Sequence, residues 1–349
     1  MSPIIQDSHL TVYCADALAA LRELPPDSVQ CCVTSPPYWG LRDYGVAGQI
    51  GLEETLAEFI QKIRAVFEEV RRALKPDGTC WVNMGDAYAG SWGAQGREGT
   101  TGAMHGRSVI AARQIARSAM REKTGSMNRL PGLKPKDLIG IPWRVAFALQ
   151  DAGWYLRSDI IWHKPNPMPE SITDRPTKAH EYLFLLSKSE RYFYDVEASK
   201  EPVTGNAHPR GDGVHPKARW KTPDGWDTSK GNGGHGTIHR GGREKGKQNE
   251  SFSAAVKDVV CTRNKRSVWT IPTAAFSDAH FATFPPDLVK PCILAGTKPG
   301  DTVLDPFGGS GTTGQVALEL GRRAILIEIN PYYLSMIKSR TTQIGFQFH

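Results

Sequence analysis

Cysteine is scarce in this sequence, and long hydrophobic runs are absent. Only six of the 349 residues are cysteine, and no two of them have the Cys-x-x-Cys spacing of many metal and redox sites. We therefore expect reduced thiols that pack as small apolar side chains, and no bound metal. No apolar run is long enough to cross a bilayer, and the N-terminus lacks the basic-then-apolar pattern of a signal peptide. These absences predict a cytoplasmic protein without a membrane partner.

Acidic residues are outnumbered by basic ones. The sequence has 43 Lys and Arg against 36 Asp and Glu, a net charge of +7, and its pI is about 9.0. This balance suits a polyanionic partner such as nucleic acid. With 40% hydrophobic and 23% charged residues, the chain is long enough for one large α/β core with a smaller appendage.

A stiff turn, Ser35–Tyr38, directly follows the apolar run 29–33, which is typical of a buried parallel strand. Ligands of open α/β sheets bind just past the carboxyl ends of such strands. Two prolines fix φ and remove two backbone donors, so the carbonyls of the turn point outward as acceptors. With the Ser35 hydroxyl and the Tyr38 ring, they suit a planar ring that carries an exocyclic amine, and a nucleobase is the obvious candidate. The alternative is an ordinary Pro-rich turn.

A second stretch has the order strand, Gly-rich turn, helix, strand. Residues 302–304 predict a short buried strand, 315–320 a helix, and 324–327 a strand that ends in Glu328. The turn 305–313 lies between the first strand and the helix; its glycines allow close backbone approach, and the helix start offers free N–H groups. A carboxylate at Glu328 is well placed for a ribose diol. A phosphate-binding P-loop is the competing interpretation, but the Lys before its Ser/Thr is missing.

Together the two stretches resemble the S-adenosylmethionine-dependent amino DNA methyltransferases, specifically their β class. In that class a Ser/Asp/Asn-Pro-Pro-Tyr motif precedes the Phe-x-Gly-x-Gly cofactor motif, here Ser35–Tyr38 and Phe307–Gly311. Protein methyltransferases with an Asn-Pro-Pro-Tyr motif have the opposite order. The resemblance covers residues 13–195 and 268–333. It implies an α/β, Rossmann-like methyltransferase fold with circularly permuted motif order and irregular target-recognition inserts.

The resemblance also implies roles for individual residues. An acid at the position of Asp16 approaches the cofactor adenine in this family, although Asp is equally a favoured helix N-cap. The residues that the resemblance assigns to catalysis are Ser35, Pro36, Pro37 and Tyr38. Those that it assigns to the cofactor S-adenosyl-L-methionine are Asp16, Ala17, Phe284, Asp305, Pro306, Phe307, Gly308, Gly309, Ser310, Gly311, Thr312 and Glu328.

The expected reaction is methyl transfer to the exocyclic amine of a base that has left the duplex. Ser35 Oγ and the Pro36 carbonyl would accept the two amine hydrogens, while Tyr38 stacks on the base. Ser-Pro-Pro-Tyr is more typical of N4-cytosine enzymes, whereas adenine enzymes usually have Asp or Asn in place of Ser35, so we favour cytosine N4 over adenine N6. A DNA-binding protein with an inactive methyltransferase fold is a further alternative, but both motifs are intact.

Composition predicts five segments along the chain. We expect catalytic-domain parts at 1–88, 136–196 and 266–349, a basic insertion at 89–135, and a Gly-rich, basic target-recognition region at 197–265. Neither insert has the aliphatic periodicity of an independent core. The candidate DNA contacts are Arg42, with a plain surface charge as the alternative, and Arg210, Arg219 and Lys221, which would read guanine edges or contact phosphate.

Apolar periodicity predicts the remaining elements. Strands are expected at residues 9–14, 79–84, 154–162 and 182–187, and helices at 17–24, 52–74 and 137–152, the second ending at Lys75–Gly78. His163 and His180 lack the partner spacing of metal ligands, so we expect structural roles for them. The expected partner is double-stranded DNA, and the resemblance adds homodimer formation and pairing with a restriction endonuclease.

Overall fold

The computed structural model describes residues 2–41, 43–89, 133, 134, 136–167, 169–202, 262–273 and 284–342. The chain divides into a larger unit, Met1–Ser199 with Arg266–His349, and a smaller unit, Lys200–Lys265. Among the described residues, no helix is both long enough and apolar enough to span a bilayer.

The described residues of the larger unit form a nine-stranded mixed sheet with the order β1-β2-β11-β10-β3-β4-β6-β5-β9. Strands β2, β11, β10, β3 and β4 are parallel, whereas β6 is antiparallel to both of its neighbours. The strands are β1 (Ile5–Gln6), β2 (Leu10–Cys14), β3 (Val29–Thr34), β4 (Leu74–Met84), β5 (Tyr155–His163), β6 (His180–Ser187), β9 (Val268–Thr270), β10 (Thr302–Asp305) and β11 (Arg323–Glu328).

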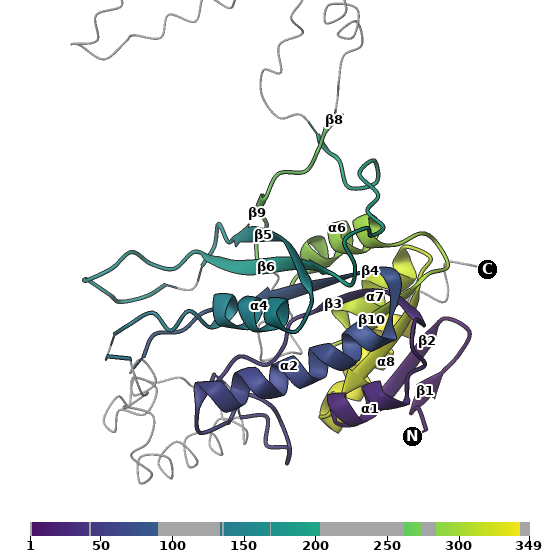
Figure 1. The fold of residues 1–349 in the computed structure, drawn as a ribbon, viewed down its shortest axis with the longest axis horizontal. Coiled ribbons are helices and arrows are strands. Elements are labelled where there is room, and N and C mark those ends of the chain that lie inside the picture. Colours follow the sequence, from purple (N-terminus) through teal and green to yellow (C-terminus); the bar gives the residue numbers. More distant parts are fainter. Residues whose placement is uncertain are drawn as a thin grey trace, which may run out of the picture. The chain divides into compact units, whose positions relative to one another are not determined.

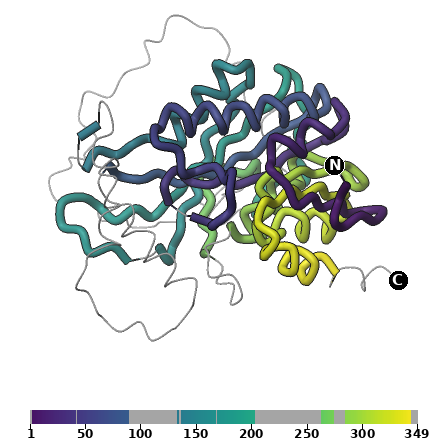
Figure 2. The backbone as a smooth tube through the Cα atoms, turned by 90° about the horizontal axis from the view of Figure 1, so that it is seen from below, coloured from purple at the N-terminus to yellow at the C-terminus, as the bar shows by residue number. Residues whose placement is uncertain are grey.

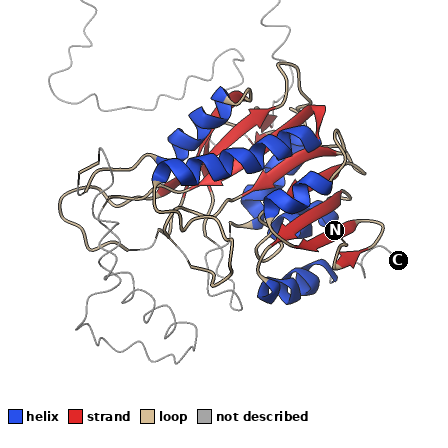
Figure 3. Ribbon diagram, turned by 60° about the horizontal axis from the view of Figure 1, so that its bottom comes forward, coloured by secondary structure: helices blue, strands red, loops and turns tan. Residues whose placement is uncertain are grey.

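Helices cover both faces of this sheet (Figure 3). Side chains of α1, α2 and α4 pack into one buried cluster, and side chains of α6, α7 and α8 pack into another. The helices are α1 (Ala17–Glu23), α2 (Leu56–Ala73), α4 (Ile141–Asp151), α6 (Pro286–Gly296), α7 (Thr312–Glu319), the 3-10 turn η2 (Pro331–Tyr333) and α8 (Leu334–Thr342). The α/β prediction is therefore confirmed.

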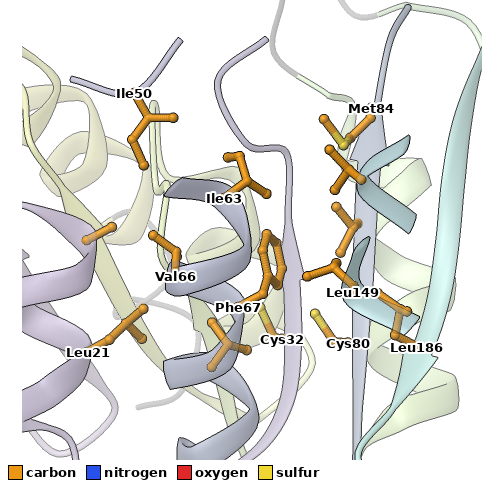
Figure 4. Packing of buried hydrophobic residues seen from close by; sticks show 14 of the residues in the cluster. Leu21, Cys32, Ile50, Ile63, Val66, Phe67, Cys80, Met84, Leu149 and Leu186 are labelled. Carbon is orange, nitrogen blue, oxygen red and sulfur yellow. The ribbon is translucent and has the colours of Figure 1, made fainter. Parts of the chain in front are cut away.

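The first of these clusters shows how the sequence pattern sets the layers. Helix α2 begins at a capping box formed by Thr55 and Glu58, which satisfies backbone donors at the helix start. Its apolar stripe faces the sheet, and Phe67 packs between α2 and the strand residues Cys32 and Cys80 (Figure 4). Strand β3 is buried along its whole length, as expected for a parallel strand that has helices on both faces.

The connections diverge at β10 and β3, which pair side by side in the centre of the sheet (Figure 1). The chain leaves β10 through α7 toward β11 and leaves β3 through α2 toward β4, on opposite faces of the sheet. Such a switch point opens a crevice at the carboxyl ends of the strands. Pairing of β2 with β11 also brings the first and last parts of the chain side by side (Figure 2, purple and yellow).

The smaller unit contains a two-stranded antiparallel ribbon of β7 (Glu201–Pro202) and β8 (Thr262–Arg263). An ion pair of 2.8 Å joins Arg263 Nε to Glu201 Oε1 across the ribbon. Most of the predicted insertion 89–135 and of the predicted target-recognition region 197–265 lies outside the described residues.

The predicted strands and helices of the catalytic core are confirmed to within a few residues, with two corrections. Lys75–Gly78 does not form a separate turn but belongs to the start of β4, where Val29 pairs with Leu74 and the register then shifts. The helix predicted at 137–152 begins only at Ile141. The N-cap residue Gly140 has a left-handed φ of 75°, which does not continue an α-helix toward the N-terminus.

Candidate functional site

The two turns singled out in the sequence lie next to each other at the switch point. The register of β3 and β10 brings Thr34 beside Asp305, and Thr34 Oγ1 donates to Asp305 Oδ1 over 2.6 Å. Thr313 Oγ1 lies 2.7 Å from Asp305 Oδ2 and 3.2 Å from the Val33 carbonyl. Residues that are almost 300 positions apart in the chain are thus joined beneath a single crevice.

Asp305 is not on the wall of that crevice. Its side chain is fully buried and accepts hydrogen bonds from Thr34, Thr313 and the Phe307 backbone N–H. Burial raises the pKa of Asp305 to about 6, against the lowering effect of those three donors. Its carboxyl group joins the two turns, and its contact with the cofactor stays a prediction.

The Gly-rich turn is shaped by close contact with β11. Gly308 donates to the Ile327 carbonyl over 2.8 Å, and a Cβ atom on Gly308 would lie 3.3 Å from that oxygen. Gly309 and Gly311 have φ values of 51° and 85°, which favour glycine. Gly311 is the N-cap of α7 and, unlike its neighbours, is not among the cavity-lining residues.

Glu328 closes the turn from the end of β11. Its Oε2 accepts from the Gly309 N–H over 2.7 Å, and its Oε1 accepts from the Asn330 N–H over 2.8 Å. The residue is only 8% exposed, and burial raises the pKa of Glu328 to about 7. Glu328 lines the cavity, and its carboxyl oxygens are hydrogen-bond acceptors.

A cavity of about 370 Å³ joins the two turns. Asp16 lies on its wall and also caps α1, because its Oδ1 accepts from the Ala19 N–H over 2.9 Å; the two interpretations of Asp16 are thus compatible. The predicted site residues on the wall are Asp16, Ala17, Ser35, Pro36, Pro37, Tyr38, Phe284, Pro306, Phe307, Gly308, Gly309, Ser310, Thr312 and Glu328.

Ser310 has a polar atom without a partner. Its side-chain hydroxyl is buried, and no hydrogen bond to it is formed within the described part of the chain. Because a buried hydroxyl costs free energy unless it is hydrogen-bonded, its position on the wall beside the start of α7 favours a polar ligand at this point.

The other end of the cavity contains Ser35 and Tyr38. Tyr38 Oη donates to Glu181 Oε2 over 2.8 Å, and Ser35 Oγ lies 3.4 Å from Asn83 Oδ1. Burial, followed by the nearby Glu181 carboxylate, raises the pKa of Tyr38 well above its ordinary value. Tyr38 is therefore neutral, and it lines the cavity with Ser35.

A family comparison decides what kind of protein has this site. The family model N6_N4_Mtase, described as DNA methylase, matches residues 29–339 and so includes both turns. The chain belongs to this DNA methylase family. The resemblance inferred from Ser35–Tyr38 and Phe307–Gly311 is confirmed.

Curated relatives of this methylase are type II methyltransferases. M.XycI of Xanthomonas campestris pv. cyanopsidis and M.Cfr9I of Citrobacter freundii are each 44% identical over 330 residues, which cover 95% of this chain and 87% of the relative. M.SmaI of Serratia marcescens is 41% identical over 329 residues, which cover 94% and 89% of the two chains.

Solved methyltransferase structures share the fold. The PvuII DNA methyltransferase, named cytosine-N4-specific, aligns with a TM-score of 0.58 at 20% identity, covering 99% of this chain and 93% of its own. TTHA0409 of Thermus thermophilus, solved with S-adenosyl-L-methionine, aligns with a TM-score of 0.53 at 21% identity, covering 96% and 95%.

Sequence reasoning missed a second set of residues on the methylase cavity. Asn83, Trp162, Lys164 and Glu181 all line it. The Lys164 ammonium pairs with Glu181 Oε1 and lies 4.2 Å from the centre of the Trp162 ring. A polar Asn83 at the end of the apolar run 79–84 was the available signal, whereas nothing in the sequence spacing joins Lys164 to Glu181.

The remaining predicted residues fall in two groups. Arg42, Arg210, Arg219 and Lys221 lie outside the residues that the structure describes, so their roles stay predictions. His163 Nδ1 lies 3.2 Å from Thr270 Oγ1, and the His180 ring packs edge-on against Tyr182. Within the described ranges, no cluster of three or more His, Cys, Asp or Glu side chains is arranged to bind a metal ion.

Proposed function

We propose that this methylase transfers a methyl group from S-adenosyl-L-methionine to the exocyclic amine of a base in double-stranded DNA, and that the base is cytosine, methylated at N4. One observation carries the proposal. The Ser35–Tyr38 turn and the Gly-rich turn open into the same cavity, which supports a site where two reactants meet.

The residues at the Gly-rich end fit the cofactor. The unpaired Ser310 hydroxyl and the start of α7 suit a charged or polar tail, and the Glu328 carboxyl group suits a ribose diol. Phe284 and Phe307 add apolar surface for an adenine ring, with Asp16 at its edge. When bound, the cofactor supplies a methyl group on a positively charged sulfur, which is a good leaving group.

The Ser35 end fits the amine. The nitrogen lone pair of an exocyclic amine is delocalised into the ring, so the base is a poor nucleophile. Acceptors at Ser35 Oγ and the Pro36 carbonyl would hold the two N–H bonds and favour a tetrahedral nitrogen, whose lone pair then attacks the methyl carbon. The new N–C bond would form as the C–S bond breaks and leaves its electron pair on the sulfur, and one N–H proton of the methylated amine would then pass to solvent. Much of the rate comes from holding the reactants together.

The order of the strands supports a β-class enzyme with permuted motif order. In this chain β10, which precedes the Gly-rich turn, follows β3, which precedes the Ser35–Tyr38 turn, although the two strands are neighbours in the sheet.

A base inside a duplex cannot reach a cavity lined by Pro36 and Phe307, so we propose that the target base is flipped out of the DNA.

Cytosine N4 is favoured over adenine N6 because residue 35 is Ser, and because a structure with the same fold is named cytosine-N4-specific. Mass spectrometry of nucleosides from DNA treated with the purified protein tests this choice. N4-methylcytosine is the expected product. N6-methyladenine as the sole product would establish the alternative, an adenine methyltransferase.

A non-catalytic DNA-binding role is the second function class. It predicts cofactor binding without transfer of radiolabelled methyl to any DNA from an unmodified host. The intact Ser35–Tyr38 turn and the shared cavity favour the enzyme.

Partners of the enzyme follow from its relatives. Because the curated relatives are type II methyltransferases, we propose that the methylase acts in the cytoplasm and protects the sites of a companion restriction endonuclease. Protection of treated DNA from endonucleases of known specificity, together with modification mapping, tests this and identifies the target sequence. Formation of a homodimer is a separate proposal, which light scattering of the purified protein tests.

A further inference from the structure

We propose that Asn83 is a positioning residue that makes Ser35 a hydrogen-bond acceptor toward the target amine. The inference rests on the proposed function, in which the Ser35 oxygen accepts an N–H of the amine. A hydroxyl group has one proton, which rotates about the C–O bond. If that proton pointed into the cavity, it would oppose the amine N–H, so a second group must hold it elsewhere.

Asn83 is in the right place to hold it. Strands β3 and β4 pair in register, with Thr34 opposite Val82, so the next residues, Ser35 and Asn83, emerge side by side. Both line the cavity, and Asn83 is only 2% exposed. The 3.4 Å from Ser35 Oγ to Asn83 Oδ1 is long for this type of bond, and catalytic hydrogen bonds commonly tighten when reactants bind.

The orientation of the Asn83 amide is set by its other side. Asn83 Nδ2 donates to the Tyr182 carbonyl over 3.2 Å. A flipped amide would place Oδ1 against that carbonyl, with two acceptors facing each other and no proton between them. The oxygen of Asn83 must therefore face Ser35 and Tyr38.

Tyr38 does not donate its hydroxyl proton to this oxygen. Tyr38 Oη also lies 3.4 Å from Asn83 Oδ1, but its single proton goes to the Glu181 carboxylate, which is closer, at 2.8 Å, and charged. The pairing of Glu181 with Lys164 holds that carboxylate in place. Asn83 Oδ1 is consequently left to accept the proton of Ser35.

The Tyr38 oxygen is the competing acceptor for the Ser35 proton, because the two hydroxyl groups also interact. A phenol oxygen is the weaker acceptor, since its lone pairs are partly delocalised into the ring. When Ser35 donates its hydroxyl proton to Asn83 Oδ1, the lone pairs of Ser35 Oγ are free to face the amine before the base arrives. This preorganisation favours methyl transfer.

The first test compares Asn83→Leu with Asn83→Asp in the full chain, using methyl transfer from tritiated S-adenosyl-L-methionine to genomic DNA from an unmodified host. Asn83→Asp keeps an acceptor for Ser35 and, with its buried carboxyl group protonated, a donor to Tyr182 as well, whereas Asn83→Leu keeps neither. We expect Asn83→Leu to lower turnover by about 10- to 100-fold, as is typical when a positioning partner is removed, and Asn83→Asp to recover most of it. Equal losses in both variants would overturn the proposal.

The second test is a double-mutant cycle. In a Ser35→Ala background Asn83→Leu should have no further effect, whereas in a Tyr38→Phe background it should keep its full effect. Loss of the effect in Tyr38→Phe, or additive effects with Ser35→Ala, would show that Asn83 acts otherwise. If Asn83→Leu does not fold, as judged by thermal unfolding and cofactor affinity, Asn83→Ala replaces it in the same cycle.

The failure of this inference and that of the proposed function are distinguishable. If Ser35→Ala turned over at the wild-type rate, the Ser35 oxygen would not be the amine acceptor. Both the role of Asn83 and the proposed mechanism at Ser35 would then fail. Slow turnover of Ser35→Ala combined with wild-type turnover of Asn83→Leu would overturn the role of Asn83 alone.

Discussion

Asp305 and Glu328 are both carboxyl groups beside the Gly-rich turn, but they do different work. Asp305 has no exposed surface and accepts from three internal donors, so it joins the two turns. Glu328 spends one oxygen on each of two backbone donors and still reaches the cavity wall. Of these two carboxyl groups, Glu328 is the one that we propose couples cofactor binding to protonation.

Cofactor affinity should rise with pH through about 7, the raised pKa of Glu328. A diol donates to the ionised carboxylate, and burial keeps this group protonated below that pH. Titration calorimetry between about pH 5.5 and pH 8.5 measures the effect, and Glu328→Gln should bind weakly with little pH dependence. The matched control is Glu319→Gln on the exposed side of α7, which should behave as wild type. A flat pH profile in the wild type would contradict the assignment.

Stability of the free protein should change with pH in the opposite direction. The folded-state pKa of Glu328 is raised from 4.5 to about 7, and that of Asp305 from 3.8 to about 6. Between these limits the folded state binds more protons than the unfolded state, so the contribution of both groups to stability falls as pH rises. Thermal unfolding of Glu328→Gln should show a smaller loss of Tm across this window than wild type, and an equal loss would contradict the shift.

Ser35→Ala should lower turnover by about 100-fold, because it removes an acceptor that is used at the reacting nitrogen. Cofactor affinity should be retained, since the substitution touches nothing in the Gly-rich turn. Initial rates of methyl transfer and calorimetry check the two parts separately. Ser28→Ala, just before β3 and with a side chain that donates to the Pro25 carbonyl, is the control and should leave turnover unchanged.

At the scale of elements, the end of β4 supports the end of β3. Gly85 directly follows β4, and a Cβ atom there would lie 2.7 Å from Tyr38 Cε2. The Tyr38 ring cannot easily retreat, because its hydroxyl is held by Glu181 on β6. Three neighbouring strands thus determine where the aromatic face of the cavity lies.

Gly85→Ala should therefore displace the Tyr38 ring and lower turnover by about tenfold or more, as misplacement of a contact group by a fraction of an ångström commonly does. Transfer rates and cofactor affinity measure the result, and affinity should stay near wild type. Gly321→Ala is the control for general strain, because it has a φ of 72° but nothing near its Cβ position. Equal losses of turnover in both variants would argue against a specific contact with Tyr38.

At the scale of the whole molecule, every described residue that lines the catalytic crevice lies in the larger unit. The smaller unit enters and leaves through β7 and β8, in which Pro202 and Thr262 are opposite each other. Residues 203–261 can therefore be removed by joining these two positions through a two-residue turn such as Asn-Gly, which suits adjacent antiparallel strands.

This deletion should abolish site-specific methylation while cofactor affinity stays unchanged, because the predicted target-recognition region is lost and the crevice is not. Loss of basic residues should also flatten the salt dependence of DNA binding. Modification mapping and calorimetry measure the two outcomes. If the deletion variant marked the same DNA sites, target recognition would have to lie elsewhere in the chain.

Local pattern alone determined much of this protein. Short stretches of sequence predicted strand, turn and helix, because each of these elements depends on residues that are close together in the chain. Examples are the apolar run before Ser35, the glycines after Asp305 and the acid at Glu328. The order of the two motifs, with the amine motif first, was enough to identify the family. These features depend on backbone geometry and on side chains within about one supersecondary unit.

Only the tertiary structure decided what lies opposite what. The Asp305 carboxyl group accepts a hydrogen bond from Thr34, 271 positions away in the chain, which no local pattern predicted. Asn83, Lys164 and Glu181 became visible as part of the site only when β4, β5 and β6 were placed beside β3. Strand pairing and burial act between segments that are distant in the chain. The acceptor that we propose for the Ser35 hydroxyl proton therefore lies on another strand, where no local sequence pattern could reveal it.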